Sequence, residues 1–375
     1  CDAGREGELI FRYLTRHFRA RQPIQRLWLQ SMTPAAIREG FARLRSDAEM
    51  RPLADAAVCR SEADWLVGIN GTRALTAFNS KGGGFFKTTV GRVQTPTLAI
   101  LVEREERIKR FVPRTYWELH ARFLCAAGQY TGRWFDETFQ RPPPSKDADD
   151  ALKPERLWDK ARAEAIHARC LGRSGVVTEE TKPSTQLSPL LFDLTSLQRD
   201  ANRRFNLPAR RTLQIAQALY ERHKVITYPR TDARALPEEY PATVRGVLDS
   251  MKNGPYAPFA ATILSGGWVH PNKRIFNNAK VSDHFAIIPT NIVPHDLNDP
   301  EQKIYDMIAR RFLAVFYPAA EYLLTTRITR VEGEPFKSEG KVLVKAGWLE
   351  VYGREPEAES ERTATSLVAV QEGEK

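Results

Sequence analysis

The sequence predicts a multidomain fold with a helical part, a strand-rich part and an inserted basic part. The chain has 375 residues, which is enough for two or three domains. Apolar residues recur at helical spacing through most of residues 1–114, whereas they alternate with polar residues within 118–139 and again within 322–349. We expect the two alternating regions to share one sheet, so that residues 188–293 form an inserted domain.

The charge balance indicates a polyanionic partner. Lys and Arg number 56 against 46 Asp and Glu, which gives a formal net charge of +10. Nine Lys or Arg and three acids lie between Arg199 and Arg234, so this stretch alone carries +6. A generic basic surface would spread its charge along the chain. The clustering therefore favours a phosphate-binding surface.

The cysteines and the apolar runs exclude several classes of protein. The four cysteines are far apart and form no C-x-x-C pair, so we expect no zinc site, no disulfide framework and a reduced cytoplasm. No apolar run approaches the roughly 18 residues of a membrane span, and no signal peptide is visible. The first residue is Cys and a motif begins at once, so we expect a piece of a longer protein, cut at both ends.

Two acids, Asp2 and Glu6, lie at the start of the first predicted helix, which runs to about residue 20. Two nearby carboxylates can hold Mg²⁺, which prefers oxygen ligands. The alternative is a helix start with acids that favour its macrodipole.

Two further helices are predicted within residues 33–48 and 54–69, the second ending at a break formed by Asn70 and Gly71. Arg60 and Asp64 are four residues apart, so they share a face of this helix, where they would form a surface ion pair. Thr95 and Pro96 predict the start of the next helix. Because Gly91 and Arg92 precede that helix start, they suggest an anion site.

Beyond residue 114 we expect strands within 118–139 and 175–182, separated by a helix at 158–171. Helices at 188–207, 209–223, 238–252 and 300–316 follow, with Asp193 as a cap candidate. The last strands are expected at 322–331 and 340–349, with a Glu-Gly-Glu turn between them.

The most informative stretch surrounds Tyr228. Val225 to Thr227 favour a strand, and Pro229 should end it, which places Tyr228 at the strand end. Arg230 lies two residues further and would share its face. A phenol beside a guanidinium suits attack on a phosphodiester, since tyrosine is a covalent nucleophile and arginine binds phosphate. The alternative is an ordinary tyrosine with its hydroxyl in water.

Residues Ile226 to Asp232, Ile-Thr-Tyr-Pro-Arg-Thr-Asp, resemble the active-site motif of type IA DNA topoisomerases in the topoisomerase III branch. Further family-like blocks occur in the family's order; they are Asp2–Glu8, Asp64–Gly68, Gly91–Pro96, Asp193–Gln198 and His284–Pro289. The resemblance spans residues 1 to about 290 and continues more weakly through Tyr352.

The resemblance implies a multidomain fold of α/β plus α+β class, in which part of a TOPRIM module precedes the toroidal type IA core. The expected domains are the C-terminal part of the Mg²⁺-binding TOPRIM domain (1–50), a helical DNA-binding base (51–114), a β-rich arch (115–187), an inserted catalytic tyrosine domain (188–293), the return of the arch (294–353) and an acidic tail (354–375). The usual TOPRIM pattern is Asp-x-Asp-x-Glu, and Gly4 occupies the second acidic position here.

The resemblance also implies roles for individual residues. Tyr228 would form a 5′-phosphotyrosine link, Arg230 would stabilise the phosphate, and His284 would assist, although a lone histidine is also commonly structural. Asp2 and Glu6 would hold Mg²⁺, and Glu6 would also shuttle protons. The expected DNA-binding residues are Arg60, Asp64, Arg73, Thr89, Val90, Gly91, Arg92, Val93, Gln94, Lys224 and Thr231.

The implied activity is transient cleavage of one DNA strand, strand passage and religation without ATP, to relax negative supercoils or to decatenate. We expect a monomer that acts on single-stranded or negatively supercoiled DNA in a bacterial cytoplasm or nucleoid. Two other functions stay open. The chain could bind single-stranded DNA without turnover, or it could be another TOPRIM enzyme, such as a nuclease or primase.

Overall fold

The computed structural model describes residues 4–29, 34–140, 143, 151–281, 284–353, 367, 368 and 370. The chain divides into two compact units. The first comprises Cys1–Val112, Leu191–Val244 and Pro271–Tyr305, and the second comprises Pro113–Leu190, Arg245–His270 and Asp306–Lys375.

The N-terminal part of the first unit is mainly helical, as expected. Its elements are α1 (Arg5–His17), β1 (Gln25–Arg26), α2 (Pro34–Ala42), β2 (Arg45–Ser46), α3 (Asp47–Asn79) and α4 (Gln94–Lys109). Helix α1 packs against α3, and a capping box between Ser46 and Glu49 starts α3. Among the described residues before α3, the only strands are β1 and β2, which form one antiparallel pair. The described part of residues 1–50 therefore contains one short strand pair, two helices and the start of α3, and not the layered α/β arrangement that the resemblance implies.

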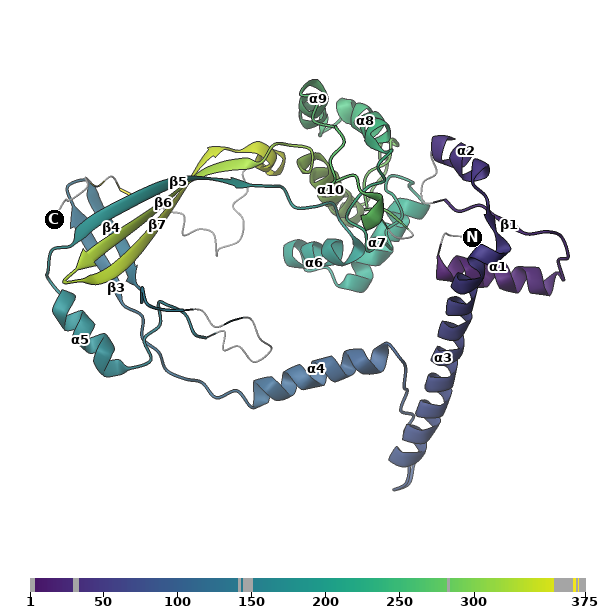
Figure 1. Ribbon diagram of the computed structural model, residues 1–375, viewed down its shortest axis with the longest axis horizontal. Helices are drawn as coiled ribbons and strands as arrows, with labels where there is room; N and C mark the ends of the chain where they lie inside the picture. Colours follow the sequence, from purple (N-terminus) through teal and green to yellow (C-terminus); the bar gives the residue numbers. More distant parts are fainter. Residues whose placement is uncertain are drawn as a thin grey trace. The chain divides into compact units, whose positions relative to one another are not determined.

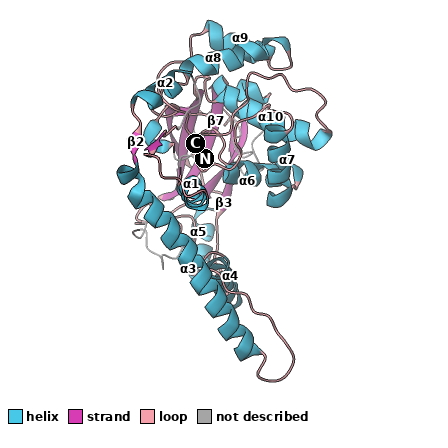
Figure 2. Ribbon diagram, turned by 90° about the vertical axis from the view of Figure 1, so that its right-hand side faces the viewer, coloured by secondary structure: helices cyan, strands magenta, loops and turns pink. Residues whose placement is uncertain are grey.

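Helix α3 is longer than the sequence predicts (Figure 2). The predicted break at Asn70 and Gly71 is wrong, because the helix continues to Asn79. A Cβ atom at Gly71 would lie 2.9 Å from Cγ1 of Val90, so the glycine lets the segment before α4 approach the helix closely. The backbone amide of Val90 donates to the Thr72 hydroxyl at 3.0 Å. Gly71 therefore serves the packing of the Val90 segment against α3, and it does not mark the end of the helix.

The remaining part of the first unit holds the predicted tyrosine segment. Helices α6 (Leu194–Phe205) and α7 (Ala209–Glu221) pack side by side (Figure 1). Asp193 caps α6 in a capping box with Ser196, as predicted, and Asn206 ends this helix in the left-handed conformation. The 3₁₀ helix η2 (Asn278–Lys280) follows later in the chain. Helices α8 (Pro241–Ser250) and α10 (Asp299–Ala314) carry the chain between the units.

A five-stranded antiparallel sheet dominates the second unit (Figure 1). Its strands, in spatial order, are β3 (His120–Cys125), β4 (Gly128–Trp134), β7 (Glu334–Lys345), β6 (Ala320–Val331) and β5 (Val176–Gln186). The prediction that the last strands rejoin the earlier ones is therefore confirmed. A tight turn at Glu332 and Gly333, both with positive φ, joins β6 to β7. The unit also contains η1 (Met251–Asn253), α9 (Ala257–Ser265) and η3 (Gly347–Tyr352).

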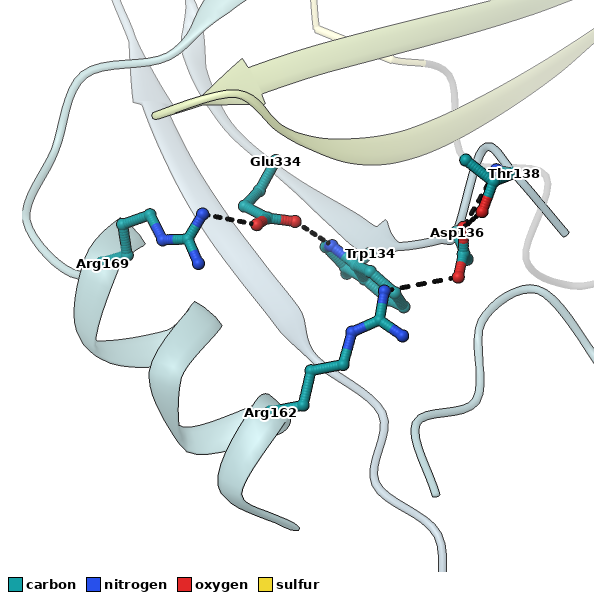
Figure 3. Close-up of polar contacts among 6 residues, drawn as sticks. All are labelled: Trp134, Asp136, Thr138, Arg162, Arg169 and Glu334. Atoms are coloured by element: carbon teal, nitrogen blue, oxygen red, sulfur yellow. Dashed lines mark hydrogen bonds and ion pairs between the residues drawn. The ribbon is translucent and has the colours of Figure 1, made fainter. Parts of the chain in front are cut away.

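Helix α5 (Lys160–Cys170) covers one end of this sheet through apolar and polar contacts. The apolar core there consists of Trp134, Leu157, Ala163, Ile166, Val331 and Phe336. The indole Nε1 of Trp134 donates to Glu334 at 2.8 Å, and Arg169 donates to the same carboxylate at 2.9 Å (Figure 3). Glu334 therefore ties the helix to the sheet while satisfying a buried indole.

The two units are coarser than the six predicted domains, whose boundaries stay predictions. Two observations bear on them: residue 50 falls inside α3, and Arg245–His270 groups with the sheet-containing unit. Within the described stretches, no helix has both the length and the apolar character needed to cross a membrane.

Candidate active site

The segment that carries Tyr228 is extended, but it forms a single bridge, between Ile226 and Pro289, instead of the predicted strand. The amide of Thr227 donates to the Ile288 carbonyl at 2.9 Å, and the Thr227 hydroxyl then takes over the pairing. This hydroxyl donates to the Ala286 carbonyl at 3.0 Å and accepts from the Ile288 amide at 2.9 Å. Because a side chain replaces the backbone and Pro289 has no N–H, no regular ladder develops.

The ring of Tyr228 is held between two other rings. Its centroid lies 4.3 Å from that of His284, with the planes inclined by 43°. On another side, Tyr220 of α7 makes an edge contact with it at a centroid distance of 5.3 Å. The side chains of Tyr228 and His284 are both half-buried. The structure thus brings together two of the predicted catalytic residues from distant parts of the chain.

Arg230 points its guanidinium to an amide on α7. With the Gln217 amide oriented so that its oxygen faces the guanidinium, that oxygen accepts from Nη2 at 2.8 Å and from Nε at 3.2 Å. Arg230 is exposed, whereas Gln217 is half-buried. One edge of the guanidinium is therefore fixed while the rest faces solvent, as a phosphate-binding arginine requires.

Thr231 and Lys224, both predicted DNA contacts, lie on either side of Tyr228. Thr231 is buried; its hydroxyl donates to the His284 carbonyl at 2.9 Å and accepts from the Ala233 amide at 3.0 Å. Lys224 is exposed, and its left-handed backbone (φ 58°) starts the extended segment. The Thr231 hydroxyl therefore holds the backbone of His284, whereas the Lys224 side chain is accessible to a ligand.

The acidic motif contributes one described residue of the predicted metal site. Asp2 lies outside the described residues, and Glu6 is exposed in the first turn of α1. Its neighbour Glu8 is only 1% exposed and is bound by the guanidinium groups of Arg12 and Arg26. Glu8 is therefore unavailable to a metal. The carboxylate of Glu6 suits a hydrated Mg²⁺, since that ion is commonly held by one or two carboxylates.

No larger cluster that could bind a metal occurs among the residues the structure describes. No three His, Cys, Asp or Glu side chains gather closely enough there. A hydrated Mg²⁺ held by one or two carboxylates does not require such a cluster.

The predicted DNA contacts of the helical part converge on Asp64. Nη1 of Arg92 lies 3.1 Å from Asp64 Oδ1 and 3.5 Å from the Arg60 carbonyl oxygen. Nε of Arg60 lies 3.9 Å from the other oxygen of Asp64. All three side chains are about half exposed, so the carboxylate aligns two cations that remain accessible.

The other predicted contacts lie nearby in sequence. Arg73 is exposed on α3, and Gln94 begins α4. Thr89, Arg92, Val93 and Gln94 are exposed, whereas Val90 and Gly91 are half-buried. Val90 packs on α3, as described above, so it shapes this segment.

The structure places two further residues, which the sequence does not predict for the site, beside the segment of Tyr228 and Arg230. They are Tyr220 and Gln217, both on α7. They are three residues apart, so they share a face of the helix. That spacing is a signal only once α7 is known to lie beside the tyrosine segment.

Comparison with known proteins supports the resemblance carried by these motifs. A family model described as DNA topoisomerase matches residues 48–375. DNA topoisomerase 3 of Bacillus subtilis (strain 168) is 42% identical over 380 residues, covering 100% of this chain and 49% of the relative. DNA topoisomerase 3 of Shouchella clausii (strain KSM-K16) is 40% identical over 379 residues, covering 100% and 48%. The chain spans about half the length of these relatives.

A solved structure shows a related fold. Full-length topoisomerase I from Thermotoga maritima matches with a TM-score of 0.65 at 22% identity, covering 100% of this chain and 56% of that chain. This likeness supports the mixed helix-and-sheet architecture. The family model and the relatives confirm the family proposed from the sequence. The chain therefore belongs to the type IA DNA topoisomerases.

Proposed function

We propose that this chain carries the strand-cleaving centre of a topoisomerase III, with Tyr228 as its nucleophile. The observation that supports this proposal most directly is the grouping around Tyr228. His284 lies against its ring, and Arg230 follows two residues later with an anchored guanidinium. A nucleophile, a ring nitrogen and a phosphate-binding cation are the groups that phosphodiester cleavage needs.

In the proposed step, the phenol oxygen of Tyr228 loses its proton and attacks phosphorus. The bond between phosphorus and the 3′ oxygen breaks with its electron pair, and that oxygen takes up a proton. The product is a 5′-phosphotyrosine and a free 3′-hydroxyl. Reversal of the same step reseals the strand. Because one phosphoester replaces another, no ATP is consumed.

The surrounding residues would lower the barrier in different ways. Arg230 would donate to the phosphate oxygens as negative charge builds on them. His284 would assist with a ring nitrogen near the same phosphate. Glu6, together with Asp2, would hold Mg²⁺, and Glu6 would also shuttle protons. The bound ion would supply positive charge to the phosphate backbone.

DNA would be held by two groups of residues on the first unit. Arg60, Arg73, Arg92 and the segment from Thr89 to Gln94 would bind single-stranded DNA, with Asp64 aligning the arginines. Lys224 would contact the backbone beside Tyr228. For Thr231 we propose placement of His284 instead of direct contact, because its hydroxyl is already used.

We further propose that the whole protein is a monomer that relaxes negative supercoils or decatenates DNA. The predicted TOPRIM, base, arch and tyrosine domains would form the toroid expected for the family. The second unit would then supply the arch that carries the tyrosine domain.

Trapping the covalent intermediate tests the proposal. The chain is incubated with a single-stranded oligonucleotide labelled at its 3′ end, which is the end that a 5′-phosphotyrosine retains, with and without Mg²⁺, and is then denatured. We expect label on the wild-type chain and none on Tyr228→Phe. Tyr13→Phe, which alters an exposed tyrosine of α1, is the control and should label like wild type. Salt-sensitive binding without any adduct would mean that this chain is only a DNA-binding segment. Cleavage that survives Tyr228→Phe would point to a nuclease.

A further inference from the structure

We propose that Gln217 is a positioning residue that orients the Arg230 guanidinium for phosphate binding. This inference rests on the proposed function, because it assigns a role in the step at Tyr228. It is carried by the two hydrogen bonds, of 2.8 and 3.2 Å, that the Gln217 oxygen accepts from Nη2 and Nε of Arg230.

These two bonds use one edge of the guanidinium. Nε and Nη2 form the side edge, so the end of the group, with its Nη1 donors, is left for a ligand. Because the guanidinium is planar, fixing one edge sets the plane of the whole fork. An arginine held in this way meets a phosphate with less loss of freedom than an arginine that rotates in solvent.

The choice of an amide has a chemical consequence. A carboxylate at this position would hold the guanidinium equally well, but it would cancel the positive charge that attracts phosphate. The amide oxygen of Gln217 accepts hydrogen bonds without carrying a net charge. Arg230 therefore keeps its full charge toward the exposed side.

Two side chains on one face of α7 contact Tyr228 and Arg230. Gln217 holds Arg230, and Tyr220, one turn later, lies against the Tyr228 ring. The opposite face is anchored in the core, since Ile215, Ala216 and Leu219 are buried. A site is more exact when its supporting side chains lie on a rigid element than when they lie on a loop. The helix thereby fixes the spacing between the nucleophile and its phosphate donor.

The test compares Gln217→Met with a matched control, Gln214→Met. Methionine keeps the length and helix propensity of glutamine but offers no oxygen acceptor. Gln214 is an exposed residue of the same helix. We expect Gln217→Met to slow adduct formation with Mg²⁺ by about 10- to 100-fold, the scale of lost hydrogen bonds to a charged group. Oligonucleotide affinity should change by less than about threefold, and Gln214→Met should react like wild type.

A double-mutant comparison separates positioning from a general loss of structure. If Gln217 acts through Arg230, then Gln217→Met should cost nothing further in an Arg230→Ala background. If the two losses multiply, Gln217 acts independently of Arg230 and the inference is overturned. An unchanged adduct rate in Gln217→Met would overturn it as well.

A spectroscopic measurement keeps the inference distinct from the proposed function. In a chain labelled with ¹⁵N-arginine, the Arg230 Nε–H resonance is identified by its loss in Arg230→Lys. We expect it to shift in Gln217→Met and to stay in place in Gln214→Met. If wild type forms no Tyr228-dependent adduct, the proposed function fails and the catalytic role of Gln217 fails with it. If wild type forms the adduct but this resonance does not shift, only the inference about Gln217 fails.

Discussion

The ring of His284 lies against the ring of Tyr228, with centroids 4.3 Å apart. Hydrogen bonds to backbone carbonyls keep this pair together. The Thr227 amide donates to the Ile288 carbonyl, and the Thr231 hydroxyl donates to the carbonyl of His284 itself. Thr231 therefore helps to position His284 directly, and Thr227 holds the segment that follows it. These contacts place His284 beside the phenol of Tyr228.

His284→Phe tests whether the histidine is chemical or structural. Phenylalanine keeps a flat ring against Tyr228 but has no nitrogen to interact with the phosphate. If the imidazole takes part in proton transfer, adduct formation should fall about 100-fold, the lower end of what such catalysis contributes. Single-turnover labelling with the oligonucleotide measures it. A rate equal to that of wild type would support the structural alternative.

Thr231→Val should disturb the contact between Tyr228 and His284 by removing a hydrogen bond to the His284 backbone. Valine has nearly the shape of threonine, but it leaves the His284 carbonyl without this donor and the Ala233 amide without this acceptor. We expect a loss of about 1–3 kcal/mol in the free energy of unfolding, together with slower adduct formation. Thr231→Ser keeps the hydroxyl and should lie close to wild type in urea unfolding. Equal stability of the valine and serine variants would exclude this role.

Glu6 and Glu8 should separate into a functional and a structural acid. Glu8→Ala removes the buried carboxylate that the half-buried Arg12 and Arg26 share, although Arg12 keeps its ion pair with Asp47, so the substitution should cost about 3 kcal/mol. Glu6 is exposed, so Glu6→Ala should change the free energy of unfolding by no more than about 0.5 kcal/mol. Only Glu6→Ala should weaken Mg²⁺ binding in a folded chain, as measured by titration calorimetry. Normal Mg²⁺ binding by Glu6→Ala would remove Glu6 from the proposed metal site.

The sequence predicted the elements well where the pattern was local. The strands within 118–139 and 322–349, the cap at Asp193 and the helices on either side of Pro208 all formed as expected. The errors arose where tertiary contacts override a local signal. Gly71 resembled a helix end because its partner, Val90, is distant in sequence. The Tyr228 segment resembled a strand because nothing local shows that the Thr227 hydroxyl replaces a backbone group.

For the candidate site, too, the sequence indicates residues within one segment but not residues that reach it through tertiary packing. The seven-residue motif predicted roles for Tyr228 and Arg230, which both lie in one short segment. The residues that support them could not be found in this way, because Gln217 and Tyr220 reach the site only through the packing of α7. Likewise, Glu6 and Glu8 look equivalent in the sequence, and only the structure shows that two arginines bind Glu8.

Gly71 and Gly246 form a matched pair for the close approach to α3. Both lie inside helices, where alanine is usually better than glycine by about 1 kcal/mol. A Cβ at Gly246 meets no atom within 4 Å, so Gly246→Ala should stabilise the protein by about that amount. A Cβ at Gly71 would collide with Val90, so Gly71→Ala should instead destabilise it by about 1–2 kcal/mol. The same variant should weaken binding of single-stranded DNA, since it displaces the segment that holds Arg92. Equal stabilisation by both substitutions would show that this segment is not packed on α3 in solution.

The carboxylate of Asp136 should make the sheet-containing unit sensitive to acid. Hydrogen bonds from Thr138, assisted by Arg162, hold the pKa of Asp136 below its ordinary value (Figure 3). Since the folded pKa is the lower one, the stabilisation is complete above the ordinary pKa of about 4 and is lost as the pH falls through the folded value. Asp136→Asn should therefore be less stable than wild type by about 1 kcal/mol at neutral pH and should match it near pH 2. Thr138→Val removes the main cause of the lowered pKa and should reproduce most of this difference in stability.

Urea unfolding at neutral pH and near pH 2, followed by tryptophan fluorescence, measures the effect. A stability difference that stays constant with pH would mean that Asp136 acts through its shape and not through its charge.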